Sequence, residues 1–145
     1  MAKIEESIDI KRPVDKVFAY TIDANSWSKW QSIIPEAEQT SQGPVDVGTT
    51  TKGTLHMMGF SMKWSGKATE YEPNRKFGKN IICGPITNEQ HNTYNPIEGG
   101  TRFTIVYDMK VGGFFRLFSP MIVSSMRKEL KKSLSNLKGI LEAQT

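Results

Sequence analysis

The sequence predicts a single α+β domain, residues 1–145, in which a curved antiparallel sheet packs against one long C-terminal helix. Apolar and polar residues alternate near the N-terminus and again between about residues 37 and 111, which is the period of strands. After Gly112 and Gly113 the apolar residues recur every three or four positions to the end of the chain. A long amphipathic helix that follows an antiparallel meander must bury its apolar stripe, and the concave face of the sheet is the available partner.

The first elements are a strand and two short helices. Residues 4–10 alternate with period two and predict a strand. Pro13 suits the first turn of the helix that follows. Trp27 and Trp30 then share one face of a second short helix, which Pro35 ends.

Six further strands complete the predicted sheet of seven. Short turn segments separate them, including a hairpin turn at residues 58–60 and a loop at residues 95–100. The clearest alternation belongs to the last strand, where Phe103, Ile105, Tyr107 and Met109 share one face. The predicted strands begin near Ala37 and then span about residues 49–58, 61–71, 77–83, 86–94 and 101–111.

The last helix carries an apolar stripe about six turns long, with lysines and arginines on the opposite face. A curved sheet around such a helix often closes imperfectly, so we expect a pocket in the gap. The residues of the stripe are Phe118, Ile122, Met126, Leu130, Leu134, Leu137 and Leu141.

Composition limits the class of protein. Hydrophobic residues make up 37% of the chain and charged residues 23%, values typical of a globular domain. Cys83 is the one cysteine, which excludes an internal disulfide and fits a reducing compartment. No apolar stretch has the length of a membrane-spanning helix or the position of a signal peptide, so we predict a cytoplasmic protein.

The net charge of +4 is concentrated in the last helix. Residues 1–109 are close to neutral, whereas basic residues outnumber acidic ones from Lys110 onward. A solvated helix face, an acidic lipid surface and an acidic partner are all compatible with this pattern. The sequence contains no nucleic-acid-binding motif, so we expect no nucleic acid partner.

Both ends of the chain resemble one known superfamily. The segment from Ile8 to Phe18 and the Trp27–Trp30 pair are similar to the start of the START-like (Bet v 1-like, SRPBCC) superfamily, in its polyketide cyclase/dehydrase-type branch. The segment from Gly112 to Pro120 and the stripe after it resemble the end of that branch. The resemblance implies a helix-grip fold, with two short helices after the first strand and an internal cavity for a hydrophobic or amphipathic molecule.

The resemblance carries over no catalytic residue. Iron-binding oxygenase members use two histidines and a carboxylate, whereas His56 and His91 fall on different predicted strands. The gate loops of plant hormone receptors and the glycine-rich loop of the pollen-allergen branch are not found in this sequence. We therefore predict no metal site and no cofactor, and the catalytic residues of any reaction stay unknown.

We expect the cavity to be lined by inward-facing residues of the sheet and helices. Tyr94, Tyr107, Glu6 or His56 would orient a ligand, although each also fits a structural or surface position. Cys83 fits buried packing better than a nucleophile. The predicted lining comprises Glu6, Trp27, Trp30, Leu55, Met57, Met62, Trp64, Ile81, Tyr94, Phe103, Ile105, Tyr107, Met109, Phe118, Ile122 and Met126.

The leading functional hypothesis is a binding or carrier protein for a hydrophobic or amphipathic small molecule, such as a lipid or polycyclic metabolite. The first alternative is a cyclase or dehydratase-type lyase, in which a tyrosine, histidine or carboxylate would move protons. The second is an adaptor that touches a membrane or a protein through the basic helix and the apolar segment 114–118. Monomer and dimer both remain open.

Overall fold

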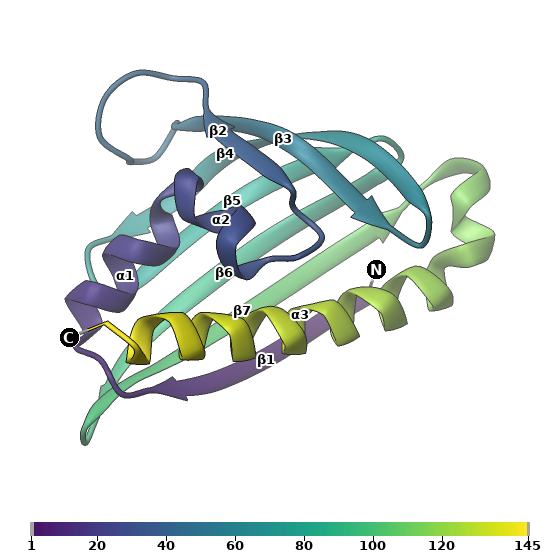
Figure 1. Ribbon diagram of the computed structural model, residues 1–145. Coiled ribbons are helices and arrows are strands. Elements are labelled where there is room, and N and C mark those ends of the chain that lie inside the picture. Colours follow the sequence, from purple (N-terminus) through teal and green to yellow (C-terminus); the bar gives the residue numbers. More distant parts are fainter. Residues whose placement is uncertain (1, 145) are drawn as a thin grey trace.

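In the computed structural model, which describes residues 2–144, seven strands form one antiparallel sheet that curves around the C-terminal helix (Figure 1). The strand order is β1-β7-β6-β5-β4-β3-β2, so every strand pairs with its neighbour in sequence except β1, which closes on β7. The predicted α+β helix-grip architecture is confirmed. The strands are β1 (Ala2–Ile10), β2 (Glu36–Gln39), β3 (Thr50–Met57), β4 (Phe60–Glu72), β5 (Lys76–Cys83), β6 (Ile86–Ile97) and β7 (Gly100–Val111).

Three helices lie on the concave side of the sheet (Figure 1). Helices α1 (Val14–Ile22) and α2 (Ala24–Trp30) follow β1, as the sequence predicts. Helix α3 (Ser119–Glu142) crosses the sheet diagonally and packs mainly on β1 and α2. None of the helices within residues 2–144 combines the length and apolar character needed to span a membrane.

Helix α3 begins later than the sequence predicts, because a 3₁₀ segment, η1 (Gly113–Phe118), precedes it. A 3₁₀ helix has three residues per turn, so its side chains do not continue the α-helical stripe. Phe118 is accordingly 41% exposed, and its assignment to the buried stripe is wrong. The remaining predicted stripe residues are all buried: Ile122, Met126, Leu130, Leu134, Leu137 and Leu141.

The loop expected at residues 95–100 is instead the end of the β6–β7 hairpin. Strand β6 continues to Ile97, and only Glu98 and Gly99 separate it from β7. Pro96 lies at the exposed end of the hairpin, where a strand tolerates a residue that cannot donate a hydrogen bond. The first residue of β7, Gly100, has to be a glycine, because a Cβ atom at this position would overlap the Ile10 carbonyl group.

The β3–β4 hairpin turns at Met58 and Gly59, as predicted, and both residues have positive φ angles, 54° and 79°. Two successive residues with positive φ angles form a type I′ turn, whose twist matches that of the two strands it connects. Met58 and Phe60 at its tip are exposed, whereas Trp64 further along β4 is buried. The hairpin therefore sends only part of its apolar cluster into the domain.

Candidate functional site

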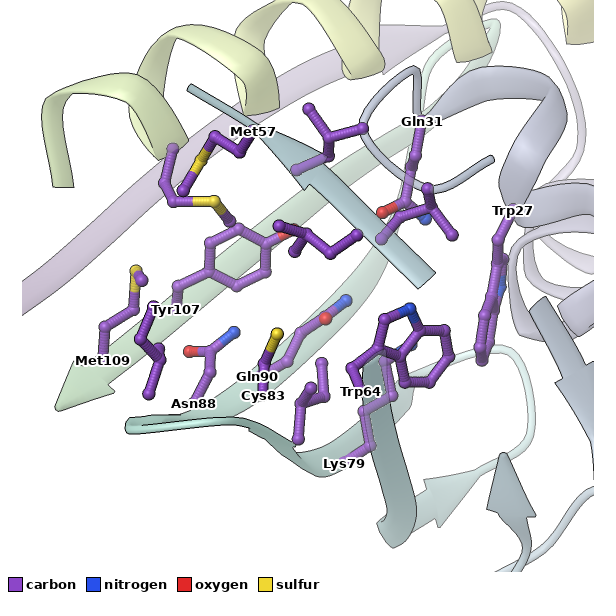
Figure 2. A pocket seen from close by; sticks show the side chains of 16 residues that line it. Trp27, Gln31, Met57, Trp64, Lys79, Cys83, Asn88, Gln90, Tyr107 and Met109 are labelled. Carbon is purple, nitrogen blue, oxygen red and sulfur yellow. The ribbon is translucent and has the colours of Figure 1, made fainter. Parts of the chain in front are cut away.

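A cavity of about 70 Å³ lies between the sheet and the helices α2 and α3 (Figure 2). Strands β3 to β7 contribute most of its wall, and α2, α3 and the segment after α2 close it. Its lining is predominantly apolar, and three methionines make part of it adaptable. The lining residues are Trp27, Gln31, Ile33, Ile34, Leu55, Met57, Trp64, Lys79, Ile81, Cys83, Ile86, Asn88, Gln90, Tyr107, Met109 and Met126.

Half of the residues predicted from the sequence line this cavity. They occupy alternate positions on their strands, or the inner faces of α2 and α3, so one side of each element supplies them. Their role in ligand binding stays a prediction. These residues are Trp27, Leu55, Met57, Trp64, Ile81, Tyr107, Met109 and Met126.

The other predicted residues lie outside the cavity, and most of them pack in the core, where the helices fill the concave face. Phe103 is completely buried, with the rings of Trp30 and Tyr94 centred 6.4 and 4.9 Å from its own. The cavity therefore occupies only the part of the concave face that the helices leave unfilled. The predicted residues that do not line it are Glu6, Trp30, Met62, Tyr94, Phe103, Ile105, Phe118 and Ile122.

Tyr94 is a structural tyrosine rather than a ligand anchor. Its hydroxyl lies 2.6 Å from the Thr21 Oγ1 atom in a buried hydrogen bond between β6 and α1. Burial raises the pKa of Tyr94, and its ring packs edge-on against Phe18. Its hydrogen-bonding capacity is thus used inside the protein.

Two further candidates for orienting a ligand also lie away from the cavity. His56 is exposed on β3, because it alternates with the inward-facing Leu55 and Met57. Glu6 is half-buried on β1, opposite Ile105 of β7, and does not reach the cavity lining. His91, the other histidine, is likewise exposed on β6.

Lys79 is the main cavity residue that the sequence patterns did not single out. It stands on the inward face of β5 and is only 6% exposed. Its Nζ atom lies 3.4 Å from the centre of the Trp27 ring and 5.9 Å from that of Trp64 (Figure 2). Burial lowers the pKa of Lys79 to about 7. The signal was present in the sequence, because Lys79 alternates with Phe77 and Ile81 on the predicted strand.

A row of buried amides on β6 was missed as well. Asn88, Gln90 and Asn92 face inward between Ile86 and Tyr94, in the same alternation that predicted the strand. The Gln90 Nε2 atom donates a 3.0 Å hydrogen bond to the Asn92 Oδ1 atom. The buried Oδ1 atom of Asn88 has no hydrogen-bond partner within residues 2–144. The cavity therefore contains an acceptor that this part of the chain leaves unused.

Tyr107 and Cys83 are the remaining ionisable residues of the lining. Tyr107 faces inward as predicted, and burial alone raises the pKa of its hydroxyl. Burial also raises the pKa of the Cys83 thiol, which favours the unreactive protonated form and agrees with a packing role. Within residues 2–144, no group of three histidine, cysteine or acidic residues could hold a metal ion.

The comparisons with known proteins agree with this architecture. Residues 1–142 match the family described as "Polyketide cyclase / dehydrase and lipid transport". The chain belongs to this family. The match spans nearly the whole chain and confirms the resemblance to the polyketide cyclase/dehydrase-type branch. No curated protein matches this member of the polyketide cyclase/dehydrase and lipid transport family.

Solved structures show the same fold at low sequence identity. A protein of Thermus thermophilus shares 15% identity with a TM-score of 0.85, and 99% of each chain is covered. The Zhui aromatase/cyclase of a Streptomyces species shares 11% identity with a TM-score of 0.85, over 97% of this chain and 93% of that one. A START superfamily protein of Mycobacterium smegmatis shares 13% identity with a TM-score of 0.81, over 99% of both chains. At these identities, the structural similarity establishes only the fold of the chain.

Proposed function

We propose that the protein binds a small amphipathic molecule in the cavity between the sheet and α3. The supporting observation is that polar side chains of Lys79, Asn88 and Tyr107 line this apolar space, and that the buried Asn88 Oδ1 atom has no hydrogen-bond partner within residues 2–144. Buried polar groups in proteins are normally hydrogen-bonded. A ligand with an apolar body and polar substituents would supply the missing partners.

The size of the cavity limits the ligand. A volume of about 70 Å³ is below the roughly 300–1,000 Å³ of typical ligand pockets. A lipid chain or a polycycle would require the side chains at one wall to move apart. Leu55 and Met57 on β3 are only half-buried, and methionine adapts readily to different shapes. We therefore favour a small ligand, or a small part of a larger one, inside this cavity.

Binding is better supported than the cyclase or dehydratase alternative. An enzyme of that kind would need titratable groups within reach of one another to move protons. Lys79, Cys83 and Tyr107 all line the cavity, but no hydrogen bond joins any two of them. The description of the family includes cyclases, so the cyclase alternative is compatible with the same fold. The two hypotheses differ only in the activity that they assign to the cavity.

The variant Leu55→Trp tests ligand binding. An indole at position 55 would occupy much of the cavity, so binding of small phenols, alcohols and ketones should weaken by about 10-fold or more. The readout is the change in tryptophan fluorescence on titration, to which Trp27 and Trp64 contribute from the cavity wall, with each variant compared with its own unliganded form. Leu55→Met is the control that conserves volume and should bind like the wild type. Equal binding by Leu55→Trp, or no saturable change with any compound, would contradict the proposal.

A second candidate function is contact with an anionic lipid surface. Segment η1 and the start of α3 expose large apolar side chains: Phe114 is 72% exposed, Leu117 79% and Met121 57%. Arg116 lies among them, and Lys128, Lys131 and Lys132 are exposed further along α3. Apolar side chains beside basic ones are typical of proteins that bind the membrane interface.

Sedimentation with vesicles of phosphatidylcholine and phosphatidylserine tests this second candidate. Binding should fall as salt rises, and the triple variant Lys128→Glu, Lys131→Glu, Lys132→Glu should lose about 3 kcal/mol of binding free energy. Lys52→Glu, Lys63→Glu, Lys67→Glu, on β3 and β4, is the matched control and should retain binding. Unchanged binding by the α3 variant would remove the electrostatic basis of this function.

A further inference from the structure

Lys79 occupies an unusual position for a lysine. Among the described residues that line the cavity, and those of the smaller cavity on the other side of Trp27, it is the one charged side chain. It forms no ion pair within residues 2–144, and its Nζ atom lies 3.4 Å from the centre of the Trp27 ring, which is a cation–π geometry. Removing an ammonium group from water without a counter-ion is costly, and a methionine or leucine would fill the same space without that cost. The amine therefore suggests a role in chemistry rather than in packing.

Burial without a counter-ion favours the neutral amine. Desolvation lowers the pKa of Lys79, and no charged group opposes it, although the face of the Trp27 ring partly favours the ammonium form. At neutral pH a large fraction of this side chain therefore carries a free lone pair, which is the nucleophilic form of lysine. Its side chain also lines the cavity, where a small molecule can approach it.

We propose that Lys79 is a covalent capture site for a small aldehyde or ketone, whose carbonyl carbon its Nζ atom attacks inside the cavity. The lone pair of Nζ forms the C–N bond while the carbonyl π bond breaks, and the nitrogen releases one proton as the oxygen takes one up, which gives a carbinolamine. The nitrogen lone pair then forms the C=N double bond as the C–O bond breaks, the hydroxyl group leaves as water with one proton, and nitrogen loses its remaining proton. The product is an imine and one water molecule, so no oxidant or reductant is needed.

The rest of the lining suits this reaction. The Tyr107 hydroxyl and the Asn88 amide provide hydrogen-bonding groups in the same cavity for the oxygen that becomes water. The surrounding apolar side chains limit the entry of water that would hydrolyse the imine. A volume of about 70 Å³ suits a carbonyl compound with a short chain. The inference rests on the cavity of the proposed function but concerns a covalent step that reversible binding does not require.

Reductive trapping with propanal tests the proposal. The full chain is incubated with propanal and sodium cyanoborohydride at about pH 7, and the propylated lysines are quantified by peptide mass spectrometry. An exposed lysine is almost fully protonated at this pH, so Lys79 should be labelled at least about 10-fold faster than Lys52 or Lys67. At about pH 10 the exposed lysines should approach its rate. Labelling of Lys79 at the same rate as these lysines, or more slowly, would overturn the proposal.

Two variants separate the covalent step from reversible binding. Lys79→Met should abolish the fast labelling and leave that of the exposed lysines unchanged. Leu55→Trp keeps the amine but fills the cavity, so it should slow the labelling of Lys79, and an unchanged rate would overturn capture inside the cavity. Fast labelling of Lys79 without saturable binding of the phenols and alcohols would contradict the proposed function alone. Saturable binding without fast labelling would overturn the imine alone.

Discussion

Lys79→Met should make the protein more stable by about 2–4 kcal/mol at pH 7. Burial lowers the pKa of the wild-type amine from 10.5 to about 7. Folding at neutral pH must therefore either remove the proton that the unfolded lysine carries or bury the charged ammonium group, and both cost free energy. Methionine has a similar length and no charge, and it packs favourably against the aromatic rings of Trp27 and Trp64.

The effect has a defined dependence on pH. The unfolded lysine binds its proton up to about pH 10.5, whereas the folded one releases it near pH 7, so wild-type stability should rise with pH between these values. The advantage of Lys79→Met should therefore shrink towards about pH 10. Urea denaturation at both ends of this range measures it, with the exposed Lys67→Met as the matched control. A destabilised Lys79→Met, or a difference that does not change with pH, would show that the amine is not buried unpaired.

Leu137→Ala should lower the free energy of unfolding by about 3–4 kcal/mol. Leu137 is completely buried on α3, and its removal leaves a cavity at the contact between the helix and the rest of the core. Leu117→Ala is the matched control, because Leu117 is 79% exposed and should change stability by less than about 0.5 kcal/mol. Both are measured by denaturant unfolding. Similar values for the two variants would mean that α3 is not held by its apolar stripe.

The sequence patterns predicted the sheet and the long helix because period-two and period-3.6 repeats depend on local geometry. The alternation of β7 correctly placed Phe103 and Met109 on the buried face, and the stripe of α3 was correct from Ile122 onward. The start of α3 could not be predicted in the same way. Residues 113–118 satisfy the same apolar spacing, yet they form a 3₁₀ segment whose side chains face outward.

The candidate site was only partly predictable, since periodicity identifies the face of a strand but not what packs opposite it. Phe103 and Tyr107 share one face of β7, yet Phe103 packs against Trp30 and Tyr94 whereas Tyr107 faces the cavity. That difference depends on where α1, α2 and α3 lie over the sheet. Lys79 was missed for another reason: selecting apolar residues along β5 passes over a lysine, although its position in the alternation places it inside.

The cavity between the sheet and α3 should bind one small molecule per chain. Native mass spectrometry of the wild type, Leu55→Trp and Leu55→Met, each purified under mild conditions and exposed to the same small phenols, alcohols and ketones, tests this most directly. We predict one added small-molecule mass per chain for the wild type and Leu55→Met, and none for Leu55→Trp. A wild type that retains no added mass, or equal occupancy in Leu55→Trp, would contradict binding in this cavity.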